Sequence, residues 1–269
     1  MQFRLFTLLP TIHYSCYTVH TIHLKGRISM NTNPAGRVAL ITGAGGGIGR
    51  AIALRLAQDG MKLVLIGRTE SKLIETKNLI PGANAHIVTG DLTDVSFPKT
   101  CIQAAVDAFG GLDVLINNAG LAQSQPFEEI SVSEYDRIMD TNVKAPFLLT
   151  QAALPHLRAS DFATVINIAS VTAHKGYPLQ SVYSASKHAL IGMSKSLANE
   201  VYKDGIRVHV ISPGGVFTDM VRIARPDLSE EGMILPEDVA EIAAFFLEHR
   251  TNAVIDEIQL HRVGKEPFA

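Results

Sequence analysis

The sequence has few cysteines, few aromatic residues and almost no net charge. Its 269 residues include Cys16 and Cys101 as the two cysteines, and no tryptophan. Two cysteines supply neither a disulfide framework nor a set of metal ligands, so we predict no metal site and a reducing, cytoplasmic location. The net charge of −2 gives no electrostatic reason to bind nucleic acid or an anionic membrane. No apolar run approaches the length needed to span a bilayer.

The N-terminal segment gives little indication of a folded element. The apolar run that follows Arg4 faintly resembles a signal peptide, but it is short and Pro10 interrupts it. No small-residue cleavage site follows the run, which argues against secretion. We expect residues 1–34 to form a disordered extension. Met30 precedes a polar run into the first predicted strand, which makes it an alternative start of the protein.

From residue 37 onward, short apolar runs alternate with helical patterns. The runs are rich in Val, Ile and Leu and show little polar alternation, which is typical of strands buried on both faces of a parallel sheet. Predicted strands are Val38–Thr42, Lys62–Gly67, Ala85–Thr89, Asp113–Asn117, Thr164–Ala169, Ile206–Ser212 and Val254–Leu260. Predicted helices are Ile48–Asp59, Lys99–Phe109, Ala145–Arg158, Val182–Lys203 and Pro236–Glu248. The alternation predicts a single α/β domain with a doubly wound parallel sheet and helices on both faces.

A glycine-rich turn follows the first predicted strand. It reads Thr42-Gly-Ala-Gly-Gly-Gly-Ile-Gly49, and an alanine-rich helix continues from Arg50. Glycines permit a tight turn and a close approach of the backbone to a ligand. The start of the helix offers unpaired N–H groups and a positive dipole end to a pyrophosphate. The order strand, glycine turn, helix therefore predicts a dinucleotide site.

The end of the second predicted strand selects between the two nicotinamide cofactors. An acidic residue there binds the ribose 2′-hydroxyl of NAD, whereas an arginine accepts the 2′-phosphate of NADP. In this chain Gly67 stands at the usual acidic position and Arg68 follows it. We therefore predict a preference for NADP(H), with NAD(H) as the alternative.

Polar residues also follow the third and fourth predicted strands. Asp91 either reaches the adenine edge of the cofactor or caps the next helix together with Asp94. The block Asn117-Asn-Ala-Gly120 either lines the ligand crevice at the carboxyl ends of the strands or forms a plain turn.

Tyr183 and Lys187 are spaced for chemistry on one helix. Four residues apart, they lie on the same face, one turn from each other. A free tyrosine has a pKa near 10 and exchanges protons poorly at neutral pH. We expect the lysine charge to lower the tyrosine pKa, so that the phenol can exchange a proton with a substrate hydroxyl or carbonyl.

Taken together, these motifs resemble the classical short-chain dehydrogenase/reductase family over about residues 35–250. The family's glycine motif corresponds to Thr42–Gly49, and its N-N-A-G block to Asn117–Gly120. Its serine corresponds to Ser170, thirteen residues before Tyr183, and its asparagine to Asn142. The resemblance implies a Rossmann-like fold of about seven strands, with residues 35–269 as the NAD(P)-binding catalytic domain.

The resemblance also implies a role for each matching residue. Tyr183 would be the general acid in carbonyl reduction, and Ser170 would stabilise charge on the substrate oxygen. Lys187 would hold the nicotinamide ribose, and Asn142 would hold a proton path to Lys187. The remaining residues expected to contact the cofactor are Gly43, Gly45, Gly47, Ile48, Gly49, Arg68, Asp91, Leu92, Asn118, Ala119, Gly120, Pro213, Gly214, Val216 and Thr218. We expect a homodimer or homotetramer acting on a small molecule.

Two departures from the family pattern bear on the substrate. The segment from Met220 to Leu235 is short for a lid, and its apolar members either face an apolar substrate or pack a short helix on the core. The C-terminal end lacks the glycine-rich finish common in ketoacyl-carrier reductases, which argues against a fatty-acid substrate and the usual tetramer contact. A nucleotide-sensing protein without turnover is the alternative from another class, and the intact set of four catalytic residues argues against it.

Overall fold

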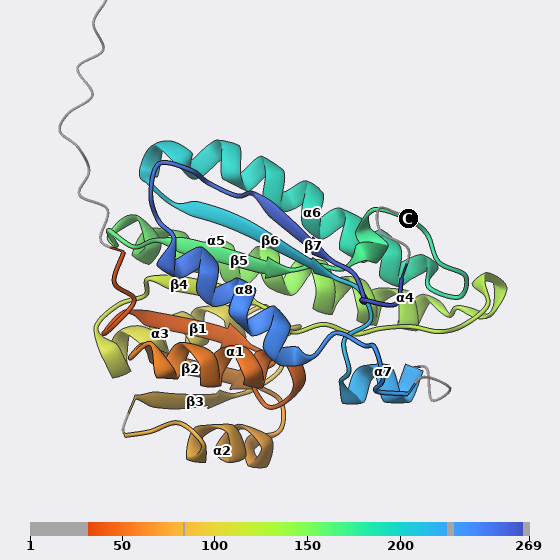
Figure 1. Cartoon of the computed structure of the whole chain (residues 1–269), viewed down its shortest axis with the longest axis horizontal. Coiled ribbons are helices and arrows are strands. Elements are labelled where there is room, and N and C mark those ends of the chain that lie inside the picture. The colour runs from red at the N-terminus through yellow and green to blue at the C-terminus, as the bar shows by residue number, and fades with distance from the viewer. Residues whose placement is uncertain (1–31, 83, 225–228, 266–269) are drawn as a thin grey trace, which may run out of the picture.

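The computed structural model of the protein describes residues 32–82, 84–224 and 229–265 (Figure 1). Most of the predicted N-terminal extension, including Met30, lies outside the described residues. Within the described ranges, no helix has the length and apolar character needed to cross a bilayer.

Seven parallel strands form one sheet in the order β3-β2-β1-β4-β5-β6-β7. Their bounds are β1 Val38–Thr42, β2 Lys62–Gly67, β3 Ala85–Thr89, β4 Val114–Asn117, β5 Thr164–Ile168, β6 Arg207–Pro213 and β7 Glu257–Leu260. The predicted doubly wound sheet is confirmed. The predicted start of β7 at Val254 is wrong by three residues, because Val254 and Ile255 are exposed and precede the edge strand.

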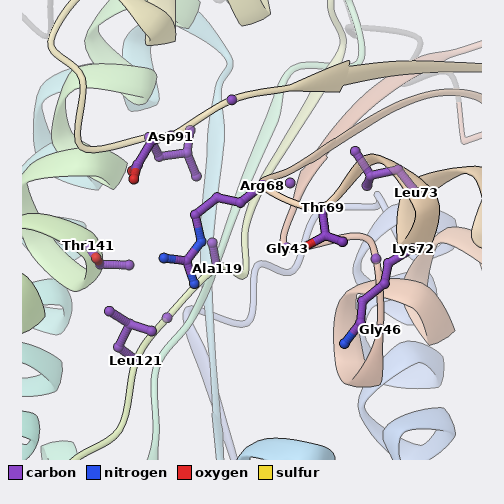
Figure 2. A pocket seen from close by; sticks show the side chains of 15 residues that line it. Gly43, Gly46, Arg68, Thr69, Lys72, Leu73, Asp91, Ala119, Leu121 and Thr141 are labelled. Atoms are coloured by element: carbon purple, nitrogen blue, oxygen red, sulfur yellow. The ribbon is translucent and has the colours of Figure 1, made fainter.

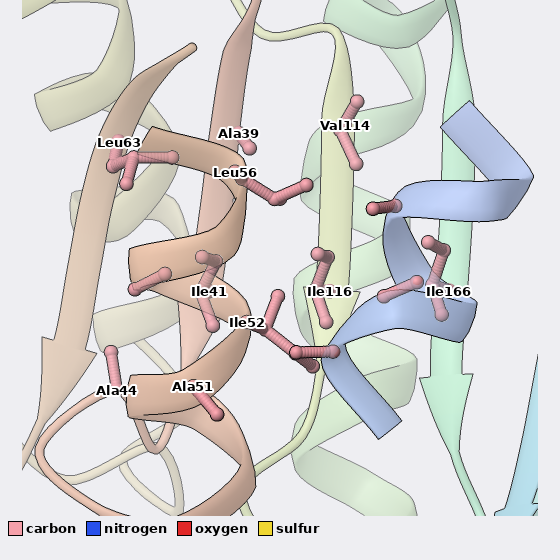
Figure 3. Close-up of a cluster of buried hydrophobic side chains, with 14 of the residues drawn as sticks. Ala39, Ile41, Ala44, Ala51, Ile52, Leu56, Leu63, Val114, Ile116 and Ile166 are labelled. Carbon is pink, nitrogen blue, oxygen red and sulfur yellow. The ribbon is translucent and has the colours of Figure 1, made fainter. Parts of the chain in front are cut away.

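Side chains of each central strand alternate between two apolar layers. Ala39 and Ile41 of β1 join the core beneath α1 (Gly47–Gln58) and α8 (Pro236–Glu248), which Figure 3 shows lying over the sheet. Val38 and Leu40 join the opposite core, with α3 (Phe97–Phe109) and α5 (Ala145–Arg158). Both faces are covered, which explains why the strands are apolar without alternation.

Further helices and short helical turns complete the structure. Two helices that no pattern predicted are α2 (Glu70–Asn78) and α4 (Val132–Met139). α2 buries Leu73 and Thr76, too few residues to produce an apolar period. α4 buries Ile138 alone and is short, although Tyr135, Ile138 and Met139 follow helical spacing. A π-helical turn (Asp140–Lys144) joins α4 to α5. The remaining elements are α6 (Ser181–Val201), α7 (Asp219–Ala224) and the 3-10 turns Phe127–Glu129, Val171–Ala173 and Tyr202–Asp204.

The strand order reverses between β1 and β4. β2 and β3 lie on one side of β1, whereas β4 and the later strands lie on the other. Ligands of doubly wound sheets bind at this reversal, outside the carboxyl ends of the strands. Thr42 ends β1 and Asn117 ends β4, so the glycine turn and the N-N-A-G block face this crevice from its two sides.

Candidate active site

The turn after β1 has a geometry that requires glycine. Gly43 and Gly47 have φ of 68° and 51°, in the left-handed region that L side chains rarely adopt. A Cβ added at Gly49 would lie 2.3 Å from the carbonyl oxygen of Gly43. At Gly46, in contrast, an added Cβ would meet no described atom within 4 Å. The turn is therefore tightly packed at Gly49 and open at Gly46, and an open backbone is what phosphate binding requires.

This glycine turn is tied to the turn after β4. The Thr42 hydroxyl accepts hydrogen bonds from the backbone N–H groups of Asn118 and Ala119, both at 2.9 Å. The Asn118 side-chain amide donates to the Thr42 carbonyl at 2.8 Å. Asn118, which the resemblance placed in the cofactor cleft, thus holds the two walls of the crevice together.

A pocket opens at the carboxyl ends of β1, β2, β3 and β4 (Figure 2). Predicted cofactor residues that line it are Gly43, Gly45, Arg68, Asp91, Leu92, Ala119 and Gly120. Lining residues absent from the predicted set are Gly46, Gly67, Thr69, Lys72, Leu73, Gly90, Leu121 and Thr141. Thr69, Lys72 and Leu73 belong to the start of α2 or its cap, so they were missed together with that helix.

Two cations border the pocket at the end of β2. The exposed Arg68 side chain projects across the pocket toward Ala119, and Lys72 extends beside Gly46 (Figure 2). A Cβ added at Gly67 would lie 3.2 Å from the Leu73 side chain, so an acidic residue would be crowded there. The end of β2 therefore presents positive charge at the position where a carboxylate selects NAD.

Asp91 lies on the opposite wall and closes a local turn. Its Oδ1 accepts hydrogen bonds from the backbone N–H and the hydroxyl of Thr93, at 2.9 and 2.8 Å. These bonds, with a smaller contribution from the Arg68 charge, lower the Asp91 pKa. Asp94 makes the same pair of bonds with Ser96. The alternative that both aspartates cap α3 is wrong, because each carboxylate bonds to residues that precede the helix.

The predicted catalytic serine and tyrosine meet at the carboxyl end of β5. Ser170 follows the strand and is buried, and its hydroxyl accepts a hydrogen bond from Thr172 N at 3.2 Å. Tyr183 lies in the first turn of α6, half-buried. Burial raises the Tyr183 pKa, whereas the neighbouring Ser170 hydroxyl lowers it by less. The predicted direction, a pKa lowered by Lys187, is therefore wrong in this structure.

The position of Lys187 explains that result. Its side chain is 4 % exposed, and Nζ donates to the Ile168 carbonyl at 2.8 Å. Nζ lies 5.8 Å from the centre of the Tyr183 ring. Burial lowers the pKa of Lys187 to about 8. The ammonium thus bonds the end of β5, and its own charge is made less stable by burial.

Asn142 lies in the π-helical turn between α4 and α5 and is buried. Its Oδ1 accepts from Leu121 N at 2.8 Å, and Nδ2 donates to Leu121 O at 2.9 Å and Ser186 Oγ at 3.0 Å. A Cβ added at Gly120 would lie 3.4 Å from Asn142 Oδ1 and 3.5 Å from Lys187 Nζ. Both side chains therefore border the same glycine, and the alternative that Asn142 caps a helix is wrong.

The segment after β6 reaches the glycine turn at Thr218. Pro213 ends β6, Gly214 N donates to Leu260 O at 2.8 Å, and Val216 is buried beside Ile234. Thr218 contacts Gly47, where an added Cβ would lie 3.1 Å from its Cγ2. Ile48 packs against the core beneath α1. Of these predicted residues, Thr218 therefore lies beside the glycine turn, and none of them lines the Arg68 pocket.

The lid segment is described in part. It begins with the short helix α7, and Val221 is half-buried. The side chains of Met220, Ile223 and Ala224 lie outside the described residues. Among the residues that the structure describes, no group of three or more His, Cys, Asp or Glu side chains forms a metal site.

The strand order and the glycine turn are typical of dinucleotide-dependent α/β enzymes, and comparison with known proteins identifies the family. Residues 37–229 match the short chain dehydrogenase family model. The chain therefore belongs to the short-chain dehydrogenase/reductase family and is an oxidoreductase of that family, whose members use NAD(P)(H).

Relatives of similar length support this assignment. An uncharacterized oxidoreductase of Staphylococcus aureus (strain MW2) is 34% identical over 227 residues, covering 84% of this chain and 97% of that protein. Levodione reductase superposes with a TM-score of 0.79 at 30% identity, covering 85% of this chain and 96% of that one. A 3-ketoacyl-(acyl-carrier-protein) reductase of Brucella melitensis, complexed with NADH, superposes with a TM-score of 0.78 at 30% identity, covering 86% of this chain and 98% of that one.

Proposed function

We propose that this protein transfers a hydride between NADP(H) and a carbonyl or secondary alcohol of a small, fairly apolar substrate. The observation that carries the proposal is the convergence of Ser170, Tyr183 and Lys187 at the end of β5, beside the crevice that Arg68 borders. The same chemistry with NAD(H) is the alternative within the family.

The side chains supply a hydrogen-bond donor and a proton donor at one point. Because burial keeps the Tyr183 phenol protonated, it can give its proton to the oxygen of a carbonyl substrate. The Ser170 hydroxyl stabilises the charge that develops on this oxygen. Lys187, held by Ile168 O, presents an ammonium near the phenol, and this positive charge stabilises the tyrosinate that forms when the proton is given up. The nicotinamide, when bound, supplies or accepts the hydride.

The residues present fit a dinucleotide. The glycine turn offers an open backbone at Gly46, and the pocket continues to the end of β2. Arg68 and Lys72 supply the charge that a ribose 2′-phosphate requires, and Gly67 leaves no carboxylate to repel it. These side chains support NADP(H) over NAD(H).

The first experiment compares thermal unfolding with NADPH and with NADH at equal concentration. A ligand that binds the folded state alone raises stability by RT ln(1 + [L]/Kd), so the two shifts rank the affinities without a known substrate. A larger shift with NADPH supports the proposal and directs a screen of carbonyl substrates. A larger shift with NADH overturns the cofactor assignment.

A Tyr183→Phe variant separates an enzyme from a nucleotide-sensing protein. Loss of the phenolic proton removes general acid catalysis, so we expect kcat to fall by about 10²-fold or more. Protection by cofactor in thermal unfolding is the control and should persist. Unchanged turnover in the variant would contradict the role of Tyr183.

Family members generally act on small molecules and form oligomers. We extend this to a cytoplasmic homodimer or homotetramer, since α5 and α6 are long and Phe147 of α5 is 49 % exposed. Sedimentation equilibrium distinguishes the two assemblies and detects a monomer.

A further inference from the structure

Gln123 is a buried polar side chain in the loop between β4 and α4. It is 4 % exposed, and it follows Gly120 by three residues. Its Oε1 accepts hydrogen bonds from the backbone N–H groups of Val182 and Tyr183, at 3.2 and 3.3 Å. The side chain therefore reaches from the cofactor loop to the first turn of the helix that contains the catalytic tyrosine.

These two bonds replace a missing helix cap. The first N–H groups of a helix have no intrahelical acceptor, and a side chain at the N-cap position normally accepts from the second or third of them. Gln180, at the N-cap of α6, makes no such bond with its side chain. Gln123 accepts from residues two and three of the helix instead, from about sixty positions earlier in the chain.

The same loop holds the segment that precedes α6. Gln125 N donates to the Leu179 carbonyl at 3.0 Å. Leu179 has φ of 65°, a left-handed conformation that is unfavourable for a leucine and that the surrounding structure has to maintain. The loop is itself anchored through Leu121, whose N–H and C=O both bond the Asn142 side chain. One loop thus connects Asn142 to the backbone of Tyr183.

We propose that Gln123 is a positioning residue for Tyr183, acting through the backbone of the first turn of α6. The orientation of its amide is determined, because only the carbonyl oxygen can accept from two N–H groups. The amide nitrogen is buried and has no hydrogen-bond partner within the described part of the chain. Burying an unpaired donor is unfavourable. The stabilisation that Gln123 gives to this part of the structure therefore comes from the two hydrogen bonds that its side-chain oxygen accepts.

Two substitutions separate the acceptor from the size of the side chain. Gln123→Met keeps the length and removes the acceptor, whereas Gln123→Glu keeps an oxygen acceptor at the same reach. A negative charge at the N-terminus of a helix is also favourable. Gln125→Met is the matched control, since this neighbouring side chain is exposed and its backbone makes the contact.

This inference rests on the proposed function, and steady-state kinetics with the best carbonyl substrate tests it. A misplacement of a catalytic group by about 1 Å can lower the rate about 10²-fold, so we expect kcat of Gln123→Met to fall by about 10-fold to 100-fold. Cofactor protection should stay unchanged, Gln123→Glu should recover most of the rate, and Gln125→Met should match the wild type. Equal kcat for Gln123→Met and Gln125→Met, or equal losses for the Met and Glu variants, overturns the proposal.

A second measurement remains informative if the wild type turns over no substrate. That result would refute the proposed function, but the hydrogen bonds between Gln123 and the first turn of α6 could still be tested. Amide hydrogen exchange at Val182 and Tyr183 should then be faster in Gln123→Met than in Gln125→Met. Equal exchange rates in the two variants would show that Gln123 does not hold the first turn of α6.

Discussion

The buried ammonium of Lys187 should make the stability of the folded protein depend on pH. Burial lowers the pKa of Lys187 from its ordinary value of 10.5 to about 8. Between these two values the unfolded chain binds a proton that the folded chain has lost. The free energy of unfolding therefore rises as pH increases from about 8 toward 10.5. The burial penalty is fully present below pH 8.

The magnitude follows from the size of the pKa change. Each unit corresponds to about 1.4 kcal/mol, so the Lys187 contribution should change by about 2 kcal/mol between pH 7 and pH 9.5. Lys187→Met removes this dependence. At pH 7, removing the buried charge of Lys187 should increase the free energy of unfolding. The variant also loses the hydrogen bond to Ile168 O, which should decrease it by about 1–3 kcal/mol and so offset part of that increase. The change with pH is therefore a cleaner quantity than stability at one pH.

The assay is urea unfolding followed by circular dichroism, because the chain has no tryptophan to report by fluorescence. Wild type, Lys187→Met and Lys195→Met are compared at pH 7 and pH 9.5. Lys195 is an exposed lysine of the same helix, so its replacement should leave the pH dependence unchanged. A difference between wild type and Lys187→Met that stays constant across this range would refute a lowered Lys187 pKa.

Two further predictions concern the Arg68 pocket and the glycine turn beside it. Arg68→Gln should weaken NADPH binding by about 10-fold to 100-fold, which corresponds to the loss of a charge-assisted hydrogen bond, and should leave the affinity for NADH unchanged. Isothermal titration calorimetry measures both affinities. Equal losses of affinity for NADPH and NADH would exclude a contact between Arg68 and the 2′-phosphate. Gly49→Ala should lower the free energy of unfolding by about 1–3 kcal/mol, because its Cβ would lie 2.3 Å from Gly43 O. Gly46→Ala, which meets no described atom within 4 Å, is the control for chemical denaturation, and an equal effect at both positions would contradict the packing argument.

Local patterns predicted the sheet and the glycine turn well. Strands buried on both faces leave continuous apolar runs, and the bounds of β1 and β2 agree with these runs. The predicted bounds of β3 also agree, although this strand is partly exposed at the sheet edge. The glycine turn was predictable because its conformation is a local property of the residues in it. Arg68 was predictable for the same reason, since it follows directly from the end of β2.

Elements that depend on partners far along the chain were not predictable. α2 buries too few side chains to show an apolar period, so Lys72 was missed although it borders the pocket. Gln123 gave no signal, because its acceptor role exists only when its loop lies beside α6. The residues before Glu257 have a strand-like composition, but they remain exposed at the sheet edge.

The sequence by itself predicted the order of the strands, the glycine turn and the side chains that we propose to supply the chemistry. These follow from periodicity, backbone preference and functional groups, which are properties of neighbouring residues. Only the tertiary structure decided how those groups behave. Burial raises the Tyr183 pKa, and it lowers that of Lys187, which bonds Ile168 O. Desolvation depends on every segment that packs around a group, and residue spacing along one helix contains no measure of it.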